Sequence, residues 1–173
     1  MSKISFIESG MTFGPFEDSD FFYIEKSQTY AKIQEHVKMA EFLLLRSSSS
    51  KMHVFVIEAK SSSPSPTNEI DFDKFINDIK MKFYNAFTLS LSMIHNRHSQ
   101  ALKELPSNFR SLNPEQIEFR LVLIINGHPI DWLPPIKSSL EFGLIPLIKT
   151  WPISGSAVIV LNEELAKEHS LIS

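Results

Sequence analysis

The sequence predicts a single α/β domain, spanning residues 1–173, in which helices flank a mixed central sheet. Three observations support this fold class. Apolar runs of strand length recur along the chain, an amphipathic helical pattern covers about residues 68–98, and the run directly before Gly127, residues 119–126, is almost entirely apolar. Such a run is typical of a strand buried on both faces. The length of 173 residues and a hydrophobic content of 43% fit one domain with a full-sized core.

The amino-terminal part predicts strands and short helical turns. Residues 3–16 combine strand formers with Gly10 and Gly14, which favours a hairpin or a strand with a turn. Residues 21–27 predict a further strand, with Glu25 on the same face as Tyr23. Residues 28–36 predict one or two helical turns.

Residues 37–46 and 51–60 predict an antiparallel hairpin, because two apolar runs are separated by four serines. Pairing Arg46 with Lys51 is expected to bring Glu41 opposite Val56 and diagonal to Glu58. Diagonal neighbours lie roughly 7–8 Å apart, so one divalent metal could bridge the two carboxylates. An odd-length loop or a bulge would turn Glu41 to the other face.

The strand over residues 51–60 ends with two charged side chains on one face. Glu58 and Lys60 share that face with Val54 and Val56, since side chains alternate along a strand. Burying the two charges in an apolar core would cost several kcal/mol. We therefore expect both side chains to reach a wet cleft.

The remainder of the chain predicts a helical crossover to parallel strands. Residues 61–67 form a loop, and the helix after it bears Lys82 on its polar face, where it is either solvated or in contact with phosphate. Residues 119–126 are then expected to run parallel to the strand over 51–60, with Asn126 and His128 at its carboxyl end, where open α/β sheets tend to bind ligands. His128 is either close to a substrate there or an ordinary turn residue.

The last third predicts a helix, a strand and a terminal helix. Residues 131–151 predict a short helix followed by an irregular apolar stretch, since Gly143 and Pro146 interrupt the pattern. Residues 156–161 predict the last strand, and Asn162 begins a terminal helix.

Composition excludes several classes of protein. There is no cysteine, so a disulfide framework and a thiolate metal site are ruled out. No apolar run approaches the roughly 18 residues that span a bilayer, and no signal peptide is evident, so we expect a soluble cytoplasmic protein without membrane contact. The formal net charge of −3 means that any DNA-binding surface must be local or supplied by a partner.

The hairpin and its charged residues resemble the PD-(D/E)xK nuclease superfamily, which has the restriction-endonuclease-like fold. The resemblance covers about residues 37–127 and rests on Glu41, the hairpin, Glu58-Ala59-Lys60 and the long helix that follows. It implies a metal-dependent nuclease that hydrolyses phosphodiester bonds in DNA. It also implies that Glu41 and Glu58 bind Mg²⁺ or Mn²⁺, and that Lys60 activates or orients the attacking water.

Two other functions stay open at this level. One is a catalytically inactive nuclease-like subunit that binds protein or nucleic acid within a larger defence or repair complex. The other is an α/β ligand-binding protein that uses the end of the strand over residues 119–126. The sequence also leaves open DNA against RNA, endonuclease against exonuclease action, a homodimer, and whether Glu8, Glu25 or Glu35 adds a further carboxylate.

Overall fold

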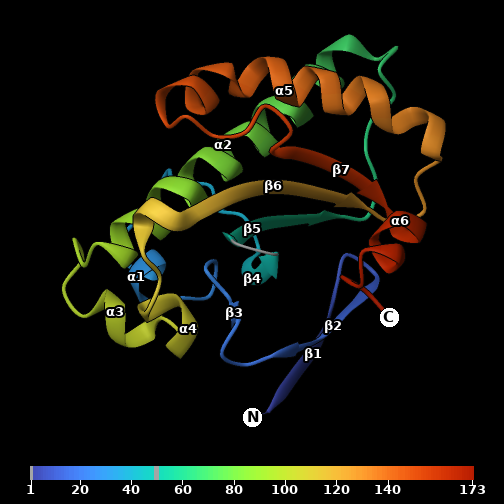
Figure 1. Ribbon diagram of the computed structural model, residues 1–173. Coiled ribbons are helices and arrows are strands. Elements are labelled where there is room, and N and C mark those ends of the chain that lie inside the picture. Colours follow the sequence, from blue (N-terminus) through green and yellow to red (C-terminus); the bar gives the residue numbers. More distant parts are fainter. Residues whose placement is uncertain (1, 49–50) are drawn as a thin grey trace.

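The computed structural model describes residues 2–48 and 51–173, and its centre is a five-stranded mixed sheet with the order β3-β4-β5-β6-β7 (Figure 1). The pairs β3–β4 and β4–β5 are antiparallel, whereas the pairs β5–β6 and β6–β7 are parallel. This arrangement confirms the predicted mixed α/β sheet. The strands are β3 (Phe21–Phe22), β4 (Phe42–Ser48), β5 (Lys51–Lys60), β6 (Ile117–Ile125) and β7 (Val158–Asn162).

Two long helices cover one face of the sheet and make the crossovers between its parallel strands (Figure 1). Helix α2 (Glu69–Ile94) begins at Asn68, whose side chain accepts a hydrogen bond from the amide of Asp71. Its buried stripe includes Ile76, Ile79 and Phe83, which pack against the sheet. Helix α2 ends at Ile94, four residues before the predicted end at His98.

Helix α5 (Leu133–Thr150) lies beside α2 and is longer than predicted. The prediction of a short helix and an irregular stretch is wrong, since Gly143 and Pro146 both lie inside one continuous helix. Leu140, Leu144 and Leu147 are buried on one face of this helix. Packing of this apolar face outweighs the weak helix propensity of the two interrupting residues.

A separate two-stranded sheet covers the other face. Strands β1 (Lys3–Glu8) and β2 (Met11–Glu17) form an antiparallel hairpin, which is the first of the two predicted alternatives, and helix α6 (Glu163–Glu168) lies beside it (Figure 1). An aromatic cluster that includes Phe13, Phe16 and Phe42 fills the space between the hairpin and β4. The sheet is therefore buried on both faces.

Short helices make up the connections. They are α1 (Gln28–Ala31), α3 (Ala101–Glu104), α4 (Ser107–Arg110) and the 3₁₀ helices η1 (Pro114–Gln116) and η2 (Ile130–Trp132). Within the described residues, no helix is both long enough and apolar enough to cross a membrane.

Two expectations for the front of the sheet need correction. The strand predicted over residues 21–27 is reduced to Phe21–Phe22, and β4 begins at Phe42 instead of residue 37. The chain from Met39 to Glu41 approaches the sheet without forming a strand ladder, although Met39 and Ala40 are buried. The burial of this apolar segment explains why it has the composition of a strand.

The register of the β4–β5 hairpin differs by two residues from the predicted one. Arg46 pairs with His53 instead of Lys51, and Leu43 instead of Glu41 lies opposite Val56. Ser48 pairs with Lys51, and the loop residues 49 and 50 lie outside the described part of the chain. Because the shift is even, Leu43 and Leu45 still face the same side of the sheet as Val54 and Val56.

Candidate functional site

The centre of the candidate site is the carboxylate of Glu58, near the carboxyl end of β5. Its Oε1 atom lies 3.0 Å from Nζ of Lys60 and 2.7 Å from Nζ of Lys82, so two ammonium groups share one carboxylate oxygen. Lys60 comes from the same strand and Lys82 from α2, which packs across that end of the sheet. Oε2 of Glu58 is buried and has no hydrogen-bond partner among the described residues.

Glu58 is sealed from solvent, whereas the two lysines are less so. The side chain of Glu58 is 0% exposed, against 28% for Lys60 and 15% for Lys82. The expectation that both side chains reach a wet cleft is therefore wrong for Glu58. It agrees with the partial exposure of Lys60. The two nearby ammonium groups offset part of the desolvation free energy of this buried carboxylate, because they replace interactions that it would make with water.

Burial and the ion pairs perturb the pKa values of this cluster in opposite ways. Burial raises the pKa of Glu58, and the charges of Lys82 and Lys60 partly oppose that rise. Burial acts to lower the pKa of Lys82, but the Glu58 carboxylate more than offsets it, so the pKa of Lys82 is raised. Lys82 is therefore held as an ammonium at neutral pH.

Glu41 lies next to this cluster, directly before β4. Its backbone N–H donates to the carbonyl of Ile57 at 3.1 Å, and the residue is 8% exposed. Burial, then the hydrogen bond with the Glu25 side chain, then the charge of Glu58 raise the pKa of Glu41 to about 8. The structure thus brings Glu41 into the same electrostatic environment as Glu58 and Lys82.

The structure also places the three carboxylates that the sequence left open. Glu25 hydrogen-bonds to Glu41 through its side chain, and its backbone N–H donates to the carbonyl of Glu41 at 3.4 Å. Glu8 acts on Glu41 only through its charge, and its own side chain accepts from the amide of Ser9. Glu35 is fully solvated beside His36. Glu25 is therefore the additional carboxylate of the site.

Lys82 is the residue whose role sequence reasoning did not identify. Its ammonium group bonds to Glu58 and its side chain is only 15% exposed, so it does not lie on an ordinary solvated face. The available signal was its position on α2, directly before Phe83 and three residues after Ile79, both fully buried. A lysine that borders the buried stripe of a helix faces the edge of the sheet, where a buried carboxylate needs a partner.

Two surface hollows lie beside the buried cluster. One is lined by Glu25, Tyr30 and Lys82, and the other by Lys60, Lys74 and the serines that follow Lys60. Lys38 and Asp78 line both hollows and form an ion pair with each other. The two lysines bound to Glu58 therefore line different openings.

The polar residues after β6 are engaged by other parts of the chain. The side-chain amide of Asn126 donates to the carbonyl of Ser9 at 3.1 Å. The Nε2 atom of His128 lies 3.2 Å from Oγ of Ser63, and its ring packs edge-on against Trp132. These contacts join the loops at this edge of the sheet, and His128 is buried.

The described residues contain no group of three acidic or histidine side chains arranged to hold a metal ion. The carboxylate oxygens that could bind a metal ion are those of Glu41 and Glu58, and Glu25 lies beside Glu41. Comparison of the chain with protein-family models, with curated proteins and with solved structures finds no match. The geometry of the site is therefore the basis for any functional conclusion.

Proposed function

We propose that this chain has the restriction-endonuclease-like fold and is a metal-dependent nuclease that hydrolyses phosphodiester bonds in DNA. Two observations support the proposal: Lys60 bonds to Glu58 near the end of β5, and Glu41, directly before β4, is close enough to Glu58 for the two charges to act on each other. The antiparallel front of the sheet and its parallel continuation after a helical crossover also fit that fold.

The carboxylates are suited to Mg²⁺ or Mn²⁺. Mg²⁺ is commonly held by one or two carboxylates together with waters and substrate phosphate oxygens, so Glu41 and Glu58 are enough protein ligands. Oε2 of Glu58 is a buried oxygen without a partner among the described side chains, and burial, followed by the neighbouring carboxylates, raises the pKa of Glu41. Both features favour a cation at this place. When bound, the metal would polarise the phosphate and acidify a water.

The two lysines have separate tasks in this proposal. Lys60 is partly exposed and lines an opening, so its ammonium group can orient the attacking water or neutralise charge that develops on the phosphate. Lys82 is less exposed and holds the Glu58 carboxylate in position from α2. We therefore assign a reacting role to Lys60 and a positioning role to Lys82.

A cleavage assay tests this function. Plasmid DNA and single-stranded DNA are each incubated with Mg²⁺ or Mn²⁺ and one of four proteins. These are the native protein, Glu58→Gln, Lys60→Ala and the control Lys137→Ala, which changes an exposed lysine of α5. We expect metal-dependent cleavage by the native protein and the control, and a loss of at least about 100-fold in the other two. Equal cleavage by all four proteins would reject the proposed site.

One observation favours a second candidate, the inactive nuclease-like subunit. Glu58 is fully buried, and both lysines occupy one of its oxygens, which is the state of a structural ion-pair cluster. A net charge of −3 also disfavours extensive contact with nucleic acid. No cleavage by the native protein in either metal, together with binding to DNA or to a protein partner that survives Glu58→Gln, would favour this candidate. A second copy of the chain is one such partner.

A further inference from the structure

The outer surface of the helical layer carries most of the exposed large apolar side chains. Among the described residues, all of these side chains except Ile7 lie on α2, on α5 or directly beside an end of α5. Helices α2 and α5 cover one face of the sheet and bury their inner sides against it (Figure 1). The exposed apolar side chains therefore face away from the sheet, where no other described part of the chain covers them.

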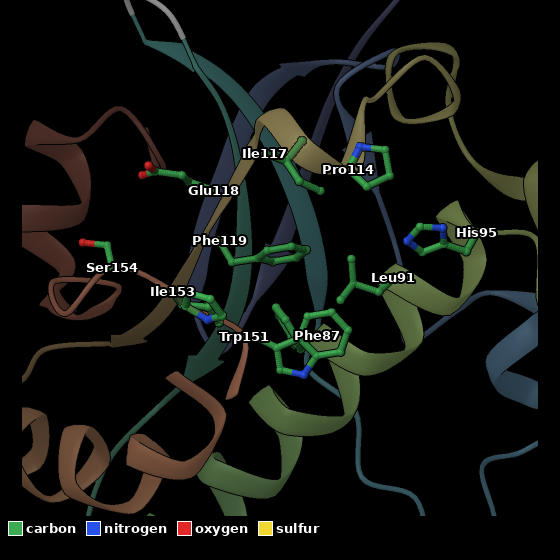
Figure 2. A pocket seen from close by; sticks show the side chains of 11 residues that line it. Phe87, Leu91, His95, Pro114, Ile117, Glu118, Phe119, Trp151, Ile153 and Ser154 are labelled. Carbon is green, nitrogen blue, oxygen red and sulfur yellow. The ribbon is translucent and has the colours of Figure 1, made fainter. Parts of the chain in front are cut away.

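Five of these side chains form one patch across the two helices, which we call the α2–α5 patch. Two contacts fix how the helices lie against each other. A β-carbon at Gly143 would be 3.1 Å from Cδ of Lys80, and the ring centroids of Phe87 and Trp151 are 5.4 Å apart. Figure 2 shows Trp151 against Phe87. The patch spans the surface between these two contacts and consists of Met81 and Tyr84 on α2, Phe142 and Ile145 on α5, and Trp151 at the end of α5.

The area of the patch is that of a dimer interface. The exposed fractions are 77% for Phe142, 52% for Trp151, 48% for Tyr84, 43% for Met81 and 39% for Ile145. With roughly 200 Å² for a whole large side chain, these fractions amount to roughly 500 Å² of accessible surface. A stable interface buries roughly 800 Å² on each partner, of which roughly 65% is apolar in homodimers. A dimer therefore needs roughly 500 Å² of apolar surface on each chain, and the patch supplies it.

The middle of the patch is free of unpaired charge. Residues 142–148 of α5 include no charged side chain, and residues 81–94 of α2 include only Lys82, which bonds to Glu58. Nucleic acid would find no cation there to contact its phosphates. Interface cores between proteins are depleted in charged residues, so a second protein surface is the better match.

A second copy of this chain is the protein that this surface fits. In a dimer with a two-fold axis both chains use the same surface, so one uncharged apolar patch meets another. Glu141 and Lys149 lie one helical turn before and one helical turn after Ile145 on α5. An antiparallel pairing of two α5 helices about Ile145 would set opposite charges at the same level. The rim of the patch therefore adds no like-charge repulsion.

We propose that the α2–α5 patch is the interface of a symmetric dimer of this chain. This inference goes beyond the proposed nuclease function and holds whether or not the Glu58 site is catalytic. None of the five patch residues belongs to the candidate site, and the measurement is the mass of the protein in solution. Loss of the dimer and loss of cleavage are therefore separate results.

A matched pair of variants provides the first test, with sedimentation equilibrium as the measurement. Phe142 and Ile7 are 77% and 75% exposed, but Ile7 lies on β1, across the sheet from the patch. We expect the native protein and Ile7→Glu to have twice the mass of one chain at about 50 μM. Phe142→Glu should raise the dissociation constant of the dimer by about 30-fold or more, because it buries an unpaired carboxylate in the interface. A monomeric native protein at that concentration, or equal dissociation constants for Phe142→Glu and the native protein, would overturn the proposal.

Fluorescence provides the second test and reports on the patch itself. The chain has 2 tryptophans, so Trp132→Phe leaves Trp151 as the only one. We expect the emission of that protein to move to shorter wavelength as its concentration rises from about 0.5 to about 50 μM, because the indole ring loses contact with water. Adding Phe142→Glu should abolish the shift. A dimer that forms without any shift would place the interface elsewhere and contradict the assignment. Circular dichroism spectra establish that each variant is folded.

Discussion

At the scale of single residues, the candidate site is a balance between burial and charge. Glu58 loses all contact with water and gains two ammonium partners on one oxygen. Glu41 and Glu25 are close enough to hydrogen-bond, which two ionised carboxylates do not do without a proton between them. The same residues therefore influence the stability of the protein and its dependence on pH.

The first prediction concerns the buried ion pair. Lys82→Met should lower the free energy of unfolding by about 3 kcal/mol. The reason is that the buried Glu58 carboxylate keeps its charge but loses one of its two ammonium partners. The double variant Glu58→Met with Lys82→Met should recover much of that loss, since both charges are removed and Lys60 can reach solvent. Urea unfolding of the single and double variants measures both values. A double variant that is less stable than Lys82→Met would contradict this account of the pair.

The second prediction concerns Glu41 and pH. The pKa of Glu41 is about 8 in the folded protein, against 4.5 for an unperturbed glutamate. Between these two pH values the folded state therefore keeps a proton that the unfolded state has lost. Glu41 therefore lowers stability as pH rises through that window, by up to about 1.4 kcal/mol per pH unit. Glu41→Gln removes this dependence and should be increasingly more stable than the native protein toward pH 8.

Thermal or urea unfolding at pH 5, 6, 7 and 8 provides the measurement, with Glu115→Gln, an exposed residue of η1, as the control. The stability difference between Glu41→Gln and the native protein should widen with pH, and that for Glu115→Gln should not. A constant difference for Glu41→Gln would show that the proton is not retained on folding.

At the scale of elements, packing decides where helices begin and end. Helix α5 continues through Gly143 and Pro146 because its leucines are buried against the sheet and α2. Gly143 lies where α5 meets α2, since a β-carbon built there would be 3.1 Å from Cδ of Lys80. The contact is with a flexible side chain and not with backbone.

The third prediction follows from this contact. Gly143→Ala should raise the free energy of unfolding by about 0.5–1 kcal/mol, because alanine has the higher helix propensity and Lys80 can move by a few tenths of an ångström. Differential scanning calorimetry measures the change in melting temperature. A lower melting temperature would mean that Lys80 is held in place, and the double variant Gly143→Ala with Lys80→Ala should then restore the stability.

At the scale of the whole molecule, the β1–β2 hairpin is a separate layer that several polar contacts join to the main sheet. Oγ of Ser9 donates to the carbonyl of Ala59 at 3.1 Å, and the side chain of Asn126 donates to the carbonyl of Ser9. Gly10 completes this turn with a φ of +78°, and a β-carbon there would lie 2.8 Å from Nδ2 of Asn126. The turn therefore connects the hairpin to the ends of β5 and β6.

The fourth prediction tests this connection with two glycines. Gly10→Ala should destabilise the protein by about 2 kcal/mol or more, because it combines backbone strain with a clash against Asn126. Gly127→Ala has a similar φ of +61° but open space around the β-carbon, so it should cost only about 1 kcal/mol. Urea unfolding compares the two. Equal losses would mean that the contact of the turn with Asn126 is unimportant.

The sequence by itself determined the mixed sheet, the long crossover helix and the place of Glu58 and Lys60 near the end of β5. These follow from apolar periodicity and strand alternation, which are local properties of the chain. It also proposed Glu41 as a site residue and left Glu8, Glu25 and Glu35 open. Periodicity, however, failed where an apolar segment was buried without forming a strand, as at Met39 and Ala40.

Only the tertiary structure decided the hairpin register, the role of Lys82, the choice of Glu25 over Glu35 and the burial of Glu58. Each of these depends on distances between residues far apart in the chain, such as Lys82 and Glu58, 24 positions apart. The free energy of a buried charge is set by the partners that surround it in space. The sequence alone does not show which residues become those partners, because they come together only when the helix packs onto the sheet.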